Sequence, residues 1–138
     1  MRGFAASFLA LSLFLPAASW AASDAERAAI CAEALERFDA VKAALPPTDP
    51  GVVTVLMYKY NFCSKSLSVK TGTVVRFVNV DKRTSHSVWF KAWGKDESDR
   101  LFPEEYWEMK FDIPGTYPYL CGPHWQQEGM VGQIEVVD

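Results

Sequence analysis

Histidine and cysteine are scarce in this sequence, which has two histidines and three cysteines among its 138 residues. Neither a C-x-x-C pair nor a C-x-x-C-H sequence is present, which argues against a dithiol redox pair and against covalently attached haem. Basic residues number 14 against 17 acidic ones, so the chain has no positive excess with which to bind nucleic acid. The length is that of one domain with few chemically reactive side chains.

Long apolar runs are also lacking, apart from one at the amino terminus. Residues 4–18 are almost all apolar, follow the positively charged Arg2, and precede the small residues around Ala21. This order is typical of a secretory signal peptide cleaved after Ala21, and the run is shorter than the roughly 20 residues of a spanning helix. We therefore expect residues 1–21 to be a signal peptide, with a membrane anchor as the alternative. The mature protein would then be periplasmic, with no membrane span.

The next segment, residues 22–50, is predicted to be a helix followed by a linker. Ser23 and Glu26 have the spacing of a capping box, and Pro46 and Pro47 end the helical pattern, which predicts a helix over residues 23–45. The apolar side chains at helical spacing are Cys31, Leu35, Phe38, Val41 and Leu45. Such a helix needs an apolar surface to pack against.

From residue 51 to 138 the apolar pattern has a period of two, as in β-strands. The clearest alternation is at Trp107, Met109, Phe111 and Ile113. Residues 74–80 are apolar on both faces, which favours a strand covered on two sides. Turn signals separate the strands, and residues 93–103 have the composition of a charged loop. We predict an all-β fold, a Greek-key β-sandwich with an added N-terminal α-helix.

The strongest chemical signal lies in residues 117–130. A strand ends at Cys121, a Gly-Pro turn follows, and His124 and Met130 lie on the same loop. Two imidazoles, one thiolate and a weak axial thioether are the ligands of blue copper. The second imidazole would be His86, the only other histidine, which shares a strand face with Val88 and Phe90.

Other interpretations of these residues remain open. A lone cysteine near a lone histidine can be a coincidence, and a buried Met130 can serve packing alone. Zinc also binds cysteine and histidine, but it favours four strong ligands, and only three are present here.

The same segments resemble the cupredoxin family, and within it plastocyanin, pseudoazurin and amicyanin. Residues 67–79 resemble the early turn and strand of the family, and residues 84–88 resemble the segment with its first histidine ligand. Residues 111–124 and 129–136 are similar to the parts that carry its cysteine, second histidine, axial methionine and closing strand. The resemblance covers residues 52–138, and it implies a cupredoxin-like copper-binding domain over residues 51–138.

The resemblance also implies a function. It predicts one type 1 copper site that alternates between Cu(I) and Cu(II), with His86, Cys121, His124 and Met130 as ligands. The protein would be an electron carrier, not an enzyme, and would exchange electrons with redox proteins such as a c-type cytochrome or a dehydrogenase. The alternatives are a copper-dependent enzyme with an oxygen-ligated or open site, and a copper storage or delivery protein.

Three features depart from the family pattern. The loop is C-x2-H-x5-M where plastocyanin and pseudoazurin have C-x2-H-x4-M, so the axial ligand can be Met130 or one of Gln126, Gln127 and Glu128. Ser87 follows the first histidine, where asparagine is common in the family. The N-terminal helix is additional.

The odd number of cysteines suggests a role for that helix. With Cys121 assigned to copper, an exported chain is expected to join Cys31 and Cys63 in a disulfide, although both could also be free.

Overall fold

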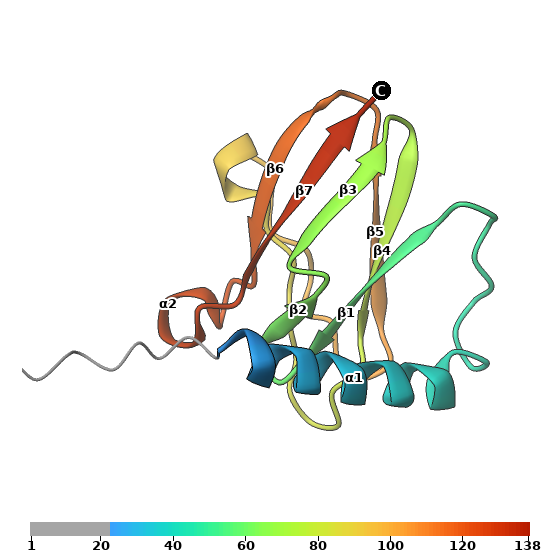
Figure 1. The fold of residues 1–138 in the computed structure, drawn as a ribbon, viewed down its shortest axis with the longest axis vertical. Helices are drawn as coiled ribbons and strands as arrows, with labels where there is room; N and C mark the ends of the chain where they lie inside the picture. Colours follow the sequence, from blue (N-terminus) through green and yellow to red (C-terminus); the bar gives the residue numbers. More distant parts are fainter. Residues whose placement is uncertain (1–22) are drawn as a thin grey trace, which may run out of the picture.

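The structure, a computed structural model, describes residues 23–138, so the expected signal peptide lies outside the described residues. Two sheets and one long helix make up half of this range (Figure 1). In chain order the elements are α1 (Asp24–Val41), β1 (Val53–Tyr58), β2 (Asn61–Cys63), β3 (Ser66–Lys70), β4 (Thr73–Asn79), the 3₁₀ helix η1 (Lys91–Trp93), β5 (Tyr106–Phe111), β6 (Gly115–Leu120), α2 (Trp125–Glu128) and β7 (Val131–Val137). Within residues 23–138, no helix combines the length and apolar character needed to cross a membrane.

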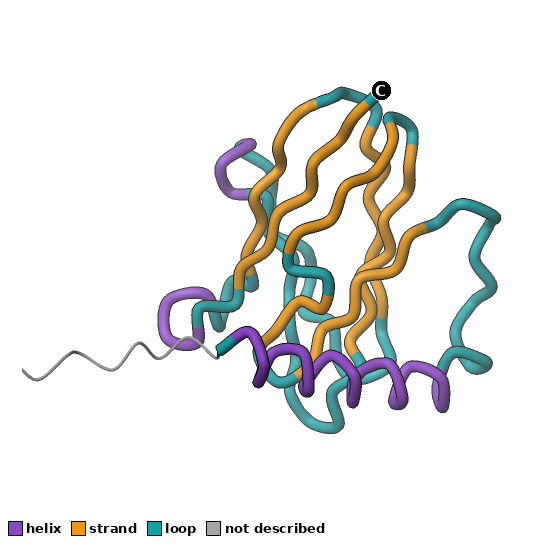
Figure 2. Tube along the Cα trace, in the orientation of Figure 1, coloured by secondary structure: helices purple, strands orange, loops and turns teal. Residues whose placement is uncertain are grey.

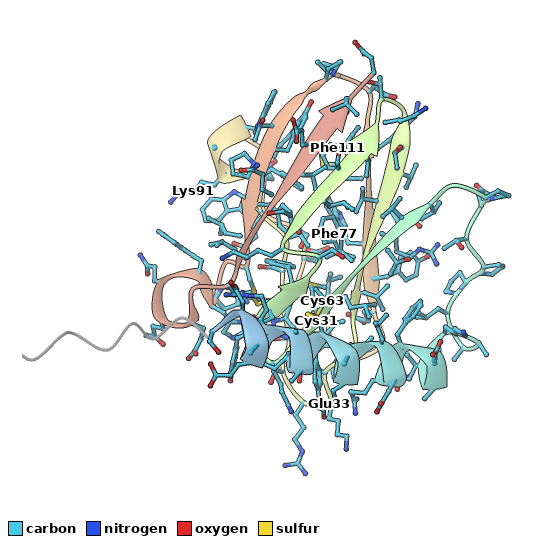
Figure 3. All side chains as sticks on the ribbon, in the orientation of Figure 1. Cys31, Glu33, Cys63, Phe77, Lys91 and Phe111 are labelled. Atoms are coloured by element: carbon cyan, nitrogen blue, oxygen red, sulfur yellow. A yellow bond between two sulfur atoms is a disulfide. The ribbon has the colours of Figure 1, made fainter. Side chains whose placement is uncertain are left out.

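The two sheets form the predicted β-sandwich. One sheet has the strand order β2-β1-β4-β5 and the other has the order β3-β7-β6. The β1–β4 and β3–β7 pairs are parallel, and the remaining pairs are antiparallel. Apolar side chains fill the space between the sheets, including Phe77 and Phe111, which are both almost fully buried (Figure 3).

A second apolar cluster lies between the first sheet and α1, which runs across the ends of β1 and β2 (Figures 1 and 2). Alternate residues of β1 therefore face different cores. Val55 and Met57 belong to the cluster between the sheets, whereas Leu56 and Tyr58 belong to the cluster under the helix. This arrangement explains why the middle strands are apolar on both faces, because each face is covered.

The helix begins as predicted and ends earlier. Glu26 N–H donates to Ser23 Oγ and Ser23 N–H donates to the Glu26 carboxylate, which together form the expected capping box. The α-helix stops at Val41, and residues 42–45 continue as tighter turns with hydrogen bonds three residues apart. The predicted apolar face was also wrong at one position, because Leu35 is 59% exposed and Ala34 is fully buried instead.

The Cys31–Cys63 disulfide is confirmed and joins the middle of α1 to the end of β2 (Figure 3). Next to it, Glu33 accepts a hydrogen bond from the Tyr58 hydroxyl and pairs with Lys59 Nζ at 2.6 Å. The helix is thus bonded to the start of the turn that connects β1 to β2 and to the far end of β2.

Two strand predictions were too long. Residues 86–90 form isolated bridges rather than a continuous strand, with His86 opposite Leu101 and Trp89 opposite Leu120. At the other position, β5 ends at Phe111, so Ile113 lies beyond the strand and is 64% exposed. The loop expected over residues 93–103 is irregular apart from the end of η1 and the bridge at Leu101.

Candidate metal centre

Two segments that are distant in sequence bring the candidate ligands together. His86 follows β4 by a short loop, and two backbone hydrogen bonds with Leu101, 3.0 and 2.8 Å long, fix its position. Cys121 directly follows β6, and the bridge between Leu120 and Trp89 holds the end of this strand beside the His86 segment. Side chains that are 35 residues apart in sequence therefore meet at one end of the sandwich.

The donor atoms of His86, Cys121 and His124 all lie within 4.8 Å of one another. Cys121 Sγ is 3.3 Å from Nδ1 of His124 and 3.8 Å from Nδ1 of His86. His86 and Cys121 are fully buried, whereas His124 is partly exposed. The structure therefore gathers three of the four predicted ligands around one point, with both imidazoles presenting the same nitrogen to the sulfur.

The loop that carries Cys121, His124 and Met130 is closed by its own backbone. The N–H groups of His124 and Trp125 donate to the carbonyl of Cys121 at 3.0 and 2.9 Å. Cys121 N–H donates to the carbonyl of Met130 at 3.0 Å, and Met130 N–H reaches the carbonyl of His124 at 3.3 Å. Met130 is 1% exposed and packs in the same core cluster as Cys121.

The segment in which the extra loop residue is expected, residues 126–128, lies in α2, the single helical turn Trp125–Glu128. Gly129 ends this turn in a left-handed conformation, with a φ of 65° that favours glycine. Gln126, Gln127 and Glu128 are all exposed, while Met130 is buried. The burial pattern favours Met130 over its three competitors as the fourth ligand.

Asp81 orients the His86 ring, a role that the sequence did not predict. Its Oδ2 atom lies 2.7 Å from Nε2 of His86, so Nδ1 is the nitrogen left to face Cys121. Asp81 is itself held, because Oδ2 also accepts the N–H of Lys59 at 3.0 Å. Carboxylate partners of this kind fix the ring and tautomer of a metal-binding histidine.

Tyr60 covers the two imidazoles from the turn between β1 and β2. Its ring meets His124 edge-on at 4.9 Å between centroids and lies 6.4 Å from His86. Lys59 and Tyr60 both have positive φ angles, 44° and 60°, which is costly for residues other than glycine. The bond from Lys59 N–H to Asp81 and the bond from the Asn61 side chain to the Lys59 carbonyl stabilise this turn.

Burial shifts the acid–base behaviour of two candidate ligands. It raises the pKa of the Cys121 thiol, and the Ser87 N–H, 3.4 Å from the sulfur, opposes this rise. Burial also lowers the pKa of His124, with a smaller contribution in the same direction from His86. In the metal-free protein a neutral His124 therefore lies beside a protonated thiol near neutral pH.

The donor set fits copper. One soft sulfur and two imidazoles in a largely buried trigonal group, with a thioether on the loop that carries Cys121 and His124, match the preference of a type 1 copper ion. A structural zinc site would require a fourth strong ligand. No other histidine or cysteine can supply one, because both histidines are already in the group and the other two cysteines form the disulfide.

Comparison with known proteins agrees with this chemistry. A family model described as copper binding proteins, plastocyanin/azurin family, matches residues 52–137. The chain therefore belongs to this copper-binding family, and its sandwich has the cupredoxin fold.

Individual relatives are an amicyanin and a plastocyanin by name. Amicyanin-alpha of Methylorubrum extorquens is 31% identical over 116 residues, which cover 76% of this chain and 97% of that protein. Chloroplastic plastocyanin of Pisum sativum is 33% identical over 109 residues, and the match spans 70% of this chain but only 59% of the plastocyanin.

Solved structures give the same assignment. A reduced amicyanin variant superposes with a TM-score of 0.56 at 26% identity, covering 65% of this chain and 86% of the amicyanin. A copper-containing nitrite reductase from Thermus scotoductus superposes with a TM-score of 0.57 at 28% identity, but the match spans only 26% of the reductase.

Proposed function

We propose that this chain is an exported blue copper protein that carries single electrons between redox proteins. His86, Cys121 and His124 would be the strong ligands, and Met130 would be the weak axial ligand. The buried group of two imidazole nitrogens around one sulfur carries this proposal, because its donor types and trigonal arrangement suit type 1 copper. When bound, the copper would supply a one-electron couple between Cu(I) and Cu(II).

The protein would hold these ligands in place and shield them from water. Asp81 orients His86, and the hydrogen bonds between Cys121, His124 and Met130 close the second ligand loop. His124 is the one partly exposed member of the group, so an electron would enter or leave on its side. Partners such as a c-type cytochrome or a dehydrogenase would dock there, next to Tyr60.

Export and the division of the chain are parts of the same proposal. Residues 1–21 would be removed as a signal peptide, residues 22–50 would form the helix and linker, and residues 51–138 would form the copper-binding domain. The disulfide between Cys31 and Cys63 supports an oxidising compartment such as the periplasm. Amino-terminal sequencing of the protein secreted by a bacterial host tests the cleavage site after Ala21.

Spectroscopy of the copper-loaded protein tests the proposed site. We expect an intense visible band from the bond between Cys121 and Cu(II), together with the electron paramagnetic resonance signal of a type 1 site. The substitution Cys121→Ser should abolish the band and leave the sandwich folded, as shown by circular dichroism. A variant that retained the band would refute the assignment. An exchangeable water on copper would indicate the enzyme alternative, and rapid loss of copper to a chelator would indicate storage or delivery.

A further inference from the structure

Ser87 makes two contacts with the loop that carries Cys121. Its backbone N–H donates to Cys121 Sγ at 3.4 Å, and its hydroxyl oxygen accepts the N–H of Gly122 at 2.9 Å. Ser87 and its bond to the sulfur are fully buried, whereas the bond from Gly122 is partly buried. The two bonds fix the sulfur and the residue after it relative to His86, the neighbour of Ser87.

Glu97 completes this arrangement from the charged loop between η1 and β5. The single proton of the Ser87 hydroxyl is donated to Glu97 Oε1 at 2.6 Å, so the hydroxyl oxygen can only accept from Gly122. A hydrogen bond that ends on a carboxylate is stronger than a neutral one, and it polarises the next bond in the chain. The carboxylate therefore strengthens the hydrogen bond from Gly122 N–H to the Ser87 hydroxyl oxygen.

Gly122 leaves the space that this carboxylate needs. A Cβ atom built on Gly122 would lie 2.0 Å from Glu97 Oε1 and 2.8 Å from Oε2. The carboxylate thus rests directly against the Cα of Gly122. Glycine is required at this position for contact with Glu97, and its φ is not in the left-handed region.

We propose that Glu97 is a positioning residue of the copper centre, which acts through the Ser87 hydroxyl and Gly122 to hold the sulfur of Cys121. This inference rests on the proposed function and deepens it. Glu97 would not touch the metal. It would keep Cys121 at the distance from Ser87 N–H that the structure shows, so that the sulfur receives the same hydrogen bond whether or not a metal is bound.

Three substitutions separate the effect of the hydrogen bond to Glu97 from the effect of its negative charge. Glu97→Ala removes the acceptor, Glu97→Gln retains an acceptor oxygen and loses the charge, and Gly122→Ala displaces the carboxylate without changing Glu97. Asp96→Ala is the matched control, since Asp96 is an exposed carboxylate one residue away that makes no hydrogen bond or ion pair with any residue from 23 to 138.

The first readout uses the copper-free protein. Hydrogen exchange of the Gly122 amide, followed by NMR, should be roughly tenfold faster in Glu97→Ala, because a charge-assisted network has been lost. Glu97→Gln keeps an acceptor oxygen but loses the charge assistance, so its exchange rate should lie between those of Glu97→Ala and the wild type, and Asp96→Ala should exchange within about twofold of the wild type. This measurement does not depend on copper, so it tests the contact even if the proposed function fails.

The second readout uses the copper-loaded protein. Loss of a residue that orients a ligand commonly weakens metal binding, so Glu97→Ala should release copper to a chelator about ten- to a hundredfold faster and shift the visible band. Gly122→Ala should reproduce both effects. The double variant should be no worse than either single variant, because both substitutions break the same contact.

Several results would overturn the inference. Unchanged amide exchange and copper release in Glu97→Ala would show that the carboxylate does not position Ser87, Gly122 or the Cys121 sulfur. Equal impairment in Glu97→Gln would assign the effect to charge, and additive effects of Glu97→Ala and Gly122→Ala would show that the two act separately. A wild-type protein without the Cys121–Cu(II) band would refute the proposed function instead, and the Gly122 exchange rates would still decide the role of Glu97.

Discussion

Removal of the disulfide between Cys31 and Cys63 should destabilise the protein by an amount that its loop length sets. The two residues are 32 apart in sequence. The chain-entropy relation for a closed loop of that size gives about 3.7 kcal/mol at 25 °C, most of it from the greater freedom of the unfolded chain. For a domain of this length, the corresponding fall in Tm is about 15 °C.

The assay is urea unfolding of the copper-free Cys31→Ala/Cys63→Ala variant, followed by tryptophan fluorescence and by far-ultraviolet circular dichroism. The slope of the unfolding free energy against urea should increase, because an unfolded chain without the cross-link exposes more surface. The protein with Cys31 and Cys63 intact, placed in reducing buffer, provides the control, because the reductant breaks the bond and both sulfur atoms stay in the core. Cys121→Ala in every sample prevents thiol exchange.

Two results would refute this reasoning. A loss of unfolding free energy below about 1 kcal/mol would contradict the expected value. It would mean that contacts of α1 with Leu56, Tyr58 and Val78 persist in the unfolded chain and already restrict it, or that the packing of α1 on these residues fully compensates for the bridge. A full loss with an unchanged urea slope would place the effect in the native state, as lost helix packing, rather than in the unfolded chain.

Three further predictions concern the core and the metal site. In the copper-free protein, the raised pKa of Cys121 favours the folded state below about pH 9, the usual value, and this contribution is lost as the pH rises toward the folded pKa. The lowered pKa of His124 contributes stability above about pH 6.5 that is lost as the pH falls toward the folded pKa. The free energy of unfolding should therefore be highest between about pH 6.5 and pH 9, and a flat pH profile would contradict the direction of both pKa shifts. Tyr119→Phe should stabilise the protein by about 1 kcal/mol in thermal unfolding, because the buried Tyr119 hydroxyl has no hydrogen-bond partner among residues 23–138, and a loss of stability would reveal a partner such as a bound water. Met130→Leu should raise the reduction potential and Met130→Gln should lower it, since removal of a donor destabilises Cu(II) and a harder oxygen favours it; unchanged voltammetry in both variants would make Met130 a packing residue only.

The parts of the fold that depend on local pattern could be predicted from the sequence. The capping box at Ser23 lies within four residues, and the alternation in β1 and β5 follows from the pleat of a strand. The disulfide followed from cysteine parity. The exposed position of Leu35 could not be predicted, because the face of α1 that meets the sheet depends on how Cys31 reaches Cys63, and that contact makes the small Ala34 the buried residue.

The ligand spacing predicted three residues that the structure brings together in the candidate metal centre, but not the residues that contact them. His86, Cys121 and His124 stood out because few other residues could bind copper. Asp81 and Glu97 gave no comparable signal, since each lies in an irregular loop where a carboxylate is expected to be solvated. Their roles depend on tertiary contacts to residues 5 and 10 positions away, which no periodicity encodes.

Under the proposed function, the bond between Asp81 and His86 has a consequence for the speed of electron transfer. His86 is held by Asp81 at Nε2 and by Leu101 at its backbone, so these contacts leave Nδ1, the nitrogen that faces Cys121, unused. A ring held in this way keeps its place when the ion beside it gains or loses an electron. The reorganisation energy of the site should therefore be small, and self-exchange between oxidised and reduced molecules correspondingly rapid. Asp81→Ala would allow the His86 ring to shift when the charge of the ion changes. Each electron transfer would then include a movement of the imidazole, and the reorganisation energy would rise.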